Sequence, residues 1–179
     1  MTRWIALLLA VLAFATSASS VAAADLQITQ SPATAPILGR TVRGTAVTTF
    51  SVSTAGAVTR KSGDAIRLSG SSVTPPTVTI GCGLLNLSGL CALRYVRVTI
   101  TPVTGVSPAR ITRLRIGPLS GGASYRTTAP SEGGSLTFDL NPLGLLSTAT
   151  FSLGMDVELG ANAASGAYTY DYIVTVQFV

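Results

Sequence analysis

The sequence contains no histidine, a single lysine and only two cysteines among its 179 residues. Without histidine, the Ser-His-Asp and Cys-His arrangements of nucleophilic enzymes are impossible, and the usual nitrogen ligand of zinc is missing. A Ser-Lys pair would have to use Lys61, which lies in an expected turn. Nothing resembles a loop that cradles phosphate or a dinucleotide. We therefore expect a protein that is not an enzyme, with no catalytic residues, no metal and no cofactor.

Acidic residues are also few, seven against twelve basic ones. Asp156 and Glu158 would share the solvent side of one strand, and Asp171 would lie on the outer face of another. Two carboxylates on one face could serve hydrolysis or hold Ca²⁺, and a hydrolase of this kind is an alternative interpretation. The more ordinary role of such acids is to solubilise the outer surface of a strand, and that is the role we expect.

Long apolar runs are absent except at the N terminus. Residues 4–14 form an apolar run behind Arg3, and small residues follow as far as Ala24. This is the form of a secretory signal, with cleavage between Ala24 and Asp25 or, as a second possibility, after Val21-Ala22-Ala23. The run is too short to span about 30 Å of hydrocarbon, and no later stretch reaches eighteen apolar residues. We expect residues 1–24 to be a signal peptide and the rest to be exported without a transmembrane span.

The remaining 155 of the 179 residues are enough for one domain with its own core. Removal of Arg3 changes the net charge from +5 to +4. Thr, Ser, Gly, Ala and Val dominate, and no window after the leader has a convincing helical period. This composition is typical of an all-β extracellular domain.

The clearest strand signal lies in residues 166–179. Every second residue there is large and apolar, and the residues between are mostly polar: Tyr168, Tyr170, Tyr172, Val174, Val176 and Phe178. A period of two is the pattern of a strand with one buried and one wet face. Burial of that face would contribute on the order of 10 kcal/mol.

Shorter segments show the same alternation. Residues 93–101 should point Val96, Val98 and Ile100 inward, and residues 135–140 and 151–159 alternate in the same way. Residues 109–117 should place Leu114 on one side and Arg113 and Arg115 on the other. About nine such strands predict an antiparallel β-sandwich, with a β-barrel as the alternative. Prolines in residues 25–44 indicate a tail, so the expected domain is 45–179.

Cys82 and Cys91 are close enough in sequence to close a loop of about ten residues. In an oxidising compartment we expect a disulfide, which would stabilise the fold by roughly 2.7 kcal/mol in the chain-entropy model. A metal pair or a redox thiol is the functional alternative.

Arginine is concentrated between residues 94 and 126. Arg97, Arg113 and Arg115 are expected on outer faces, where they would form a basic patch suited to a polyanion, a polysaccharide or a membrane surface. Nearby Tyr95 and Tyr125 do not reproduce the aromatic pattern of RNA-binding sheets, so nucleic acid is not expected. Arginine used simply as surface charge is the alternative.

Three sequence patterns occur together after residue 62. They are Gly63-x-Ala65-Ile66-x-Leu68-x-Gly70, then Leu143-Gly144-x-x-x-Thr148-Ala149-Thr150-Phe151-Ser152-Leu153-Gly154, then Gly166-x-Tyr168-x-x-x-x-Val174-x-Val176. Jointly they resemble the DUF4402 family, which are secreted bacterial β-domains of unassigned biochemistry. The resemblance covers most of residues 45–179 and is clearest after Leu143.

The terminal segment also resembles that of spore-coat-U-type proteins and chaperone–usher pilus subunits. Those proteins carry a glycine fourteenth from the end and an aromatic residue next to last, as Gly166 and Phe178 are here. They are immunoglobulin-like sandwiches that lack one strand, and a chaperone and then a neighbour's N-terminal extension fill the groove beside their last strand. The resemblance implies that Gly166 and the alternating apolar face from Tyr168 to Phe178 line such a groove, with Leu26 and Ile28 as donor residues.

Together these observations favour an exported, non-enzymatic bacterial protein of the periplasm or cell surface. Its fold would be an immunoglobulin-like, pilin-like antiparallel β-sandwich, and its role would be structural or adhesive, as in a fimbria. Its partners would be other copies of itself or a periplasmic chaperone. The alternative function is a self-contained secreted module that binds carbohydrate or polyanion.

Overall fold

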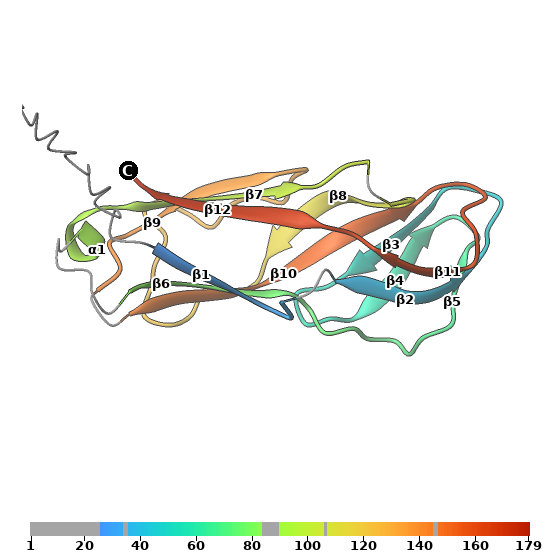
Figure 1. The fold of residues 1–179 in the computed structure, drawn as a ribbon, viewed down its shortest axis with the longest axis horizontal. Coiled ribbons are helices and arrows are strands. Elements are labelled where there is room, and N and C mark those ends of the chain that lie inside the picture. Colours follow the sequence, from blue (N-terminus) through green and yellow to red (C-terminus); the bar gives the residue numbers. More distant parts are fainter. Residues whose placement is uncertain (1–25, 34–35, 84–89, 106, 145–146) are drawn as a thin grey trace, which may run out of the picture.

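The computed structural model describes residues 26–33, 36–83, 90–105, 107–144 and 147–179. The expected signal peptide, residues 1–24, lies outside the described residues. Within them the chain forms an elongated, nearly all-β molecule with antiparallel sheets (Figure 1). Its single described helix, α1 (Leu90–Leu93), has four residues, and no described helix is long and apolar enough to cross a membrane.

One layer of the molecule is a six-stranded sheet built around a long central strand, β10 (Thr148–Leu159). The first part of β10 pairs with β6 (Thr77–Cys82), whose other edge carries β1 (Leu26–Ser31). The second part pairs with β3 (Thr48–Val52) on one side and β8 (Ala109–Ile116) on the other. β3 in turn pairs with β4 (Val58–Ser62).

The opposite layer consists of two three-stranded sheets. One has the order β12-β7-β9, with β12 at Tyr172–Phe178, β7 at Val96–Pro102 and β9 at Leu136–Leu140. The other has the order β11-β2-β5, with β11 at Gly166–Thr169, β2 at Ile37–Val42 and β5 at Ile66–Arg67. The terminal segment therefore joins the two sheets and runs along much of the long axis (Figure 1).

A single apolar core fills the space between the layers. From the first layer it includes Val78, Ile80, Phe151, Leu153 and Met155, and from the second Val96, Val98, Ile100, Leu136, Phe138 and Leu140. The rings of Phe138 and Phe151 meet edge to face across the layers, with their centroids 5.8 Å apart. The result is a sandwich-like all-β fold, as the alternating patterns predict.

The terminal alternation translates into one inward and one outward face. The side chains of Tyr170 and Val174 are only 2% and 7% exposed. Ile173, which lies on the outer face, is 55% exposed. Two strands replace the single long strand that the pattern predicts. The chain changes pairing partner at Tyr170 and Asp171, where Tyr170 N donates to Pro36 O and Val103 N donates to Asp171 O.

Residues 25–44 are not the tail that their prolines indicated. They contain β1 and β2, both paired in antiparallel ladders. Pro32 follows the last residue of β1, and β1 lies at the edge of its sheet. Proline thus ends this edge strand rather than preventing it, because only the residues before it need to donate to the ladder.

The strict alternation expected for residues 109–117 is also wrong. Ile111 and Leu114 are both buried although three residues apart, and Thr112 and Arg113 between them are exposed. The register with β10 shifts at this point, so that Val157 pairs with Ile111 while Asp156 pairs with Arg113. A β-bulge of this kind inserts one residue and resets which side chains face the core.

The expected disulfide is present between Cys82 and Cys91, with their Cα atoms 6.3 Å apart. It connects the end of β6 to α1, and Cys91 is fully buried. The bridge therefore fixes the end of β6 against the segment that enters β7.

Replacement of both cysteines by alanine should lower the free energy of unfolding by about 2–3 kcal/mol, because the unfolded chain then regains the entropy of a loop of about ten residues. Urea unfolding of the variant and the oxidised parent measures this difference. Reduced parent protein should match the variant. Equal stability of the oxidised parent and the variant would contradict the assigned contribution.

Substitution at Val174 and Ile173 tests the orientation of the terminal strand. Val174→Ala should cost about 2 kcal/mol, since two buried methyl groups and their contacts are lost. Ile173→Ala should change stability by no more than about 0.5 kcal/mol because that side chain is largely in solvent. Both follow from urea unfolding, and a larger cost for Ile173 than for Val174 would show that the faces are reversed.

Candidate functional sites

The seam between β1 and β12 is the first candidate site. These strands contact each other from opposite layers. Among the described residues β12 pairs only with β7, and β1 only with β6, so each strand has a free edge. Half-buried apolar side chains packed against the core line the seam: Leu26, Tyr172, Val176 and Phe178. Part of the inward apolar face is therefore incompletely covered.

A cavity of about 300 Å³ lies at one end of the same seam. It is formed where β1 has ended and β12 begins, and its lining includes Gln30 and Ala33 on one side and Val103 and Tyr172 on the other. Burial raises the pKa of Tyr172 and of Tyr170 to about 12, so both phenols are neutral at physiological pH. Apart from the Asp171 carboxylate in the lining of this cavity, the seam thus presents neutral, largely apolar side chains.

The two candidate donor residues lie in the same seam but are held by their own chain. Leu26 pairs with Cys82 and Ile28 with Ile80, both on β6. Leu26 is half buried, and Ile28 is 36% exposed. Four of the six β1 side chains are exposed, so the attachment of β1 depends to a large extent on backbone pairing along one edge.

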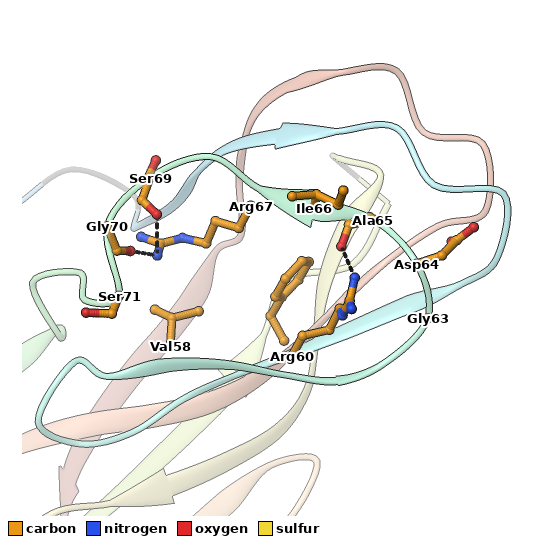
Figure 2. A pocket seen from close by; sticks show the side chains of 11 residues that line it. Val58, Arg60, Gly63, Asp64, Ala65, Ile66, Arg67, Ser69, Gly70 and Ser71 are labelled. Carbon is orange, nitrogen blue, oxygen red and sulfur yellow. Dashed lines mark hydrogen bonds between the residues drawn. The ribbon is translucent and has the colours of Figure 1, made fainter.

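A second and larger cavity, of about 660 Å³, lies between the β3–β4 hairpin and β5 (Figure 2). Phe50 and Val58 contribute apolar lining, and Arg60 and Arg67 contribute two guanidinium groups. The amino-acid composition of residues 57–71 gave no signal for this cavity. The cavity forms because β5 pairs with β2 in the other layer and not with the β3–β4 hairpin.

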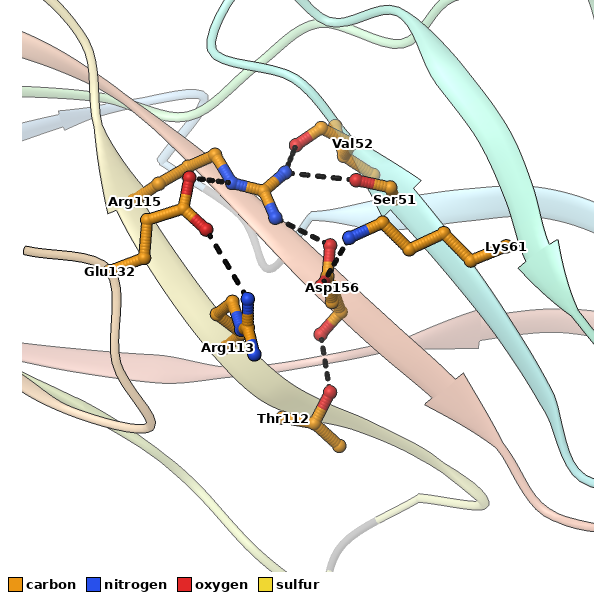
Figure 3. A network of polar contacts seen from close by, with 8 residues as sticks. All are labelled: Ser51, Val52, Lys61, Thr112, Arg113, Arg115, Glu132 and Asp156. Atoms are coloured by element: carbon orange, nitrogen blue, oxygen red, sulfur yellow. Dashed lines mark hydrogen bonds and ion pairs between the residues drawn. The ribbon is translucent and has the colours of Figure 1, made fainter.

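A buried polar network occupies the outer side of β10 (Figure 3). Asp156 is only 6% exposed and accepts from Lys61 Nζ at 2.9 Å and from Arg115 Nη2 at 2.6 Å. Arg115 also donates to Ser51 Oγ at 2.9 Å. Its Nε lies 3.2 Å from Glu132 Oε1, an ion pair without the geometry of a hydrogen bond. The face expected to be wet is covered at its centre by charged side chains that form ion pairs with one another.

Electrostatics explain why Asp156 is ionised in this setting. Burial alone would raise its pKa, but hydrogen bonds from Lys61, Ser51 and Arg115 outweigh that effect and lower the pKa below its ordinary value. Glu158, two residues along the same face, accepts from Arg110 Nε at 2.9 Å. Asp171 lies in the other layer, between β11 and β12. The acids that could have formed a hydrolytic pair thus serve separate contacts.

The structure does not gather Arg97, Arg113 and Arg115 into one free basic patch. Arg97 lies on β7 and donates to both oxygens of Asp139, at 2.8 and 3.1 Å. Arg113 and Arg115 lie on β8 in the opposite layer and share Glu132. Each of the three positive charges therefore has a carboxylate partner.

The arginines without a carboxylate partner among the described residues are Arg40, Arg43, Arg60, Arg67 and Arg94. Four of these five lie on or beside β2, β4 and β5, at one end of the molecule. The net positive charge of the chain is therefore located away from the arginine-rich stretch that composition singled out.

Comparison of the chain with protein-family models, with curated proteins and with solved structures found no match. The resemblance to DUF4402 domains and pilus subunits accordingly remains a prediction from the sequence. Among the described residues no group of three Cys, Asp or Glu side chains is placed to hold a metal ion.

Asp156→Asn should lower the free energy of unfolding at neutral pH by about 2–3 kcal/mol, somewhat less than for a fully buried pair because Lys61 is half exposed. The lowered pKa of Asp156 in the folded state means that its contribution is present above about pH 4 and lost as the pH falls through the folded pKa. Parent and variant should therefore differ at pH 7 and converge at acid pH.

Urea unfolding at a series of pH values measures both stabilities. Asp171→Asn is the matched control, since the Asp171 carboxylate forms no ion pair within the described residues and its loss should cost no more than about 0.5 kcal/mol. A parent–variant difference at position 156 that stays constant down to pH 2 would contradict the assigned electrostatic role.

Proposed function

We propose that the chain is an exported, non-enzymatic bacterial surface protein, a structural or adhesive subunit that associates through the open edge of β12. The observation that carries this proposal is the free β12 edge, which adjoins half-buried apolar side chains of the core. An added strand would satisfy the free backbone groups of β12 and would cover Tyr172, Val176 and Phe178.

Comparison with the other strand edges supports β12 as the strand-accepting one. β4 carries Arg60 and Lys61 and has a register shift against β3, and β11 has only four residues with a register shift against β2. β5 has only two residues, and segments around Tyr125 and Gly133 bridge the outer edges of β9 and β8. Charged side chains, register irregularities, a short strand and a covering segment each protect an edge strand from pairing with another chain. β12 has seven residues in unbroken register, with no charge and no proline.

The occupant we propose is the N-terminal strand of a second copy, with Leu26 and Ile28 facing the seam. β1 is suited to exchange because it is short, lies at an edge and has four of its six side chains exposed. A periplasmic chaperone would occupy the same edge before assembly. The alternative of a self-contained polyanion-binding module receives no support from Arg97, Arg113 and Arg115, whose charges are already paired.

The test uses the chain from Asp25 to Val179, isotope-labelled, and a synthetic peptide of residues 25–33. We expect the peptide to perturb the backbone amides of β12 and the chain to associate at high concentration. If only the backbone amides of β6 were perturbed, the peptide would be replacing β1 in its own position. A chain that stays monomeric and whose amides do not respond to the peptide would overturn the proposal.

Charge substitutions on the two faces of β12 sharpen this test. Val176→Lys places an ammonium group in the seam and should weaken peptide binding at least about tenfold, because the charge would have to be desolvated by the added strand. Ile173→Lys places the same charge on the outer face, where Ile173 is 55% exposed, and should leave binding nearly unchanged. Urea unfolding of both variants checks that each remains folded.

A further inference from the structure

The cavity between the β3–β4 hairpin and β5 combines positive charge with apolar lining. Its volume of about 660 Å³ lies within the ordinary range of small-molecule sites. Figure 2 shows Val58 and Arg60 coming from the β4 side and Arg67 from the β5 side. Phe50 also lines the cavity and is only 2% exposed. The cavity is thus a mixed site lined by two cations and a few apolar side chains.

Arg60 is the more available of the two cations. Its side chain is exposed, and its one described hydrogen bond runs from Nη1 to Ala65 O, at 3.1 Å. A guanidinium has five N–H donors in a fork that fits a carboxylate or a sulfate with two parallel hydrogen bonds. Arg60 therefore retains donors for an anion that enters the cavity.

Arg67 contributes charge from a fixed position. Its Nε donates to Leu38 O, its Nη1 to Gly70 O, and its Nη2 to Ser72 O at 3.2 Å. All of these acceptors are carbonyls, so the guanidinium is held in place while its charge is not neutralised by a carboxylate of the described residues. Burial lowers the pKa of Arg67, which reflects the cost of a charge removed from water without a counter-ion.

The one carboxylate that lines the cavity is directed elsewhere. Asp64 accepts from Thr45 Oγ1 at 2.6 Å and from the backbone N atoms of Thr45 and Ala46, both at 2.9 Å. These bonds, that of the Thr45 hydroxyl first, lower the pKa of Asp64 to about 2. Because both of its oxygens bind the residue 45–46 loop, Asp64 does not pair with Arg60 or Arg67.

From these contacts we propose that the cavity binds an acidic saccharide through its carboxylate or sulfate group. Arg60 holds the oxyanion, Arg67 supplies a fixed positive potential, and Val58 and Ile66 contact the sugar ring. The Ser69 and Ser71 side chains at the rim suit a ligand rich in hydroxyl groups better than a purely apolar acid. This site is independent of the strand-accepting edge of β12, and it would give an exported subunit an adhesive function.

The test is calorimetric titration of the purified, disulfide-intact chain with three probes: trigalacturonate for the carboxylate, a heparin-derived tetrasaccharide for the sulfate and neutral maltotriose. We expect binding of at least one acidic probe and none of maltotriose. The acidic probe that binds identifies the source of the oxyanion. Absence of binding by both acidic probes at millimolar concentration, or equal binding of maltotriose, would overturn the proposal.

Matched variants separate the cavity from general surface charge. Arg60→Ala should weaken binding at least about tenfold through loss of the charge-assisted bonds. Arg40→Ala removes the same charge from β2, outside the cavity lining, and should change affinity less than about threefold. Equal weakening by the two substitutions would show non-specific attraction to the basic end and would contradict the proposed site.

A second pair of variants gives an independent check. Ser71→Glu introduces a carboxylate at the rim of the cavity that competes for Arg60, and it should abolish measurable binding. Ser72→Glu adds the same charge one residue further on, outside the cavity lining, and should retain most of the affinity. Both serine side chains are exposed, so neither change should disturb folding. Binding that survives Ser71→Glu would place the ligand elsewhere.

Discussion

The fold depends on the burial of β10 between neighbours on both of its edges and an apolar layer on its inner side. Its inward residues are almost fully buried, from Phe151 through Leu153, Met155 and Val157 to Leu159. The strand serves two sheet regions, with β6 along its first part and with β3 and β8 along its second. Because one strand organises both regions, the two halves of the layer share a single core rather than forming separate units. The second layer covers that core with two smaller sheets, and the terminal segment contributes a strand to each of them.

Much of this architecture could be predicted from the sequence because period-two alternation depends only on which residues must leave water. Val96, Val98 and Ile100 are inward, and so are Leu136, Phe138 and Leu140. The pattern did not reveal the bulge at Thr112, since an inserted residue is visible only against its pairing partner. It also treated residues 166–179 as one strand, because the change of partner at Tyr170 leaves the alternation intact. The local alternation of apolar residues determines which side chains face the core. Strand pairing, in contrast, depends on segments that are distant in the sequence.

The candidate sites were less accessible to sequence reasoning, for an electrostatic reason. Arginine density indicated a basic patch around Arg97, Arg113 and Arg115. Strand pairing, however, places Asp139 and Asp156 beside these arginines, and the loop before β9 adds Glu132. The excess charge then belongs to arginines whose strands carry few acids, notably Arg60 and Arg67. Which cations are neutralised depends on cross-strand neighbours, and composition contains no information on those. Asp156 is buried among cations and not solvated for the same reason, because its neighbours from other strands are Lys61 and Arg115.

The two open regions of the molecule differ in chemistry in a way that separates their roles. Along β12 the seam is apolar, and one backbone edge of β12 has no pairing partner within the described part of the chain, so the seam favours a polypeptide strand over a charged solute. The cavity beside β5 has a short edge strand that offers little backbone for pairing, but it concentrates positive charge and hydrogen-bond donors. The described lining of the seam cavity comes from residues 30–36, 103 and 171–173, and that of the other cavity from residue 50 and residues 58–71, so the two linings share no residue. A strand added to β12 would leave Arg60 accessible, which allows assembly and ligand binding to coexist in one chain.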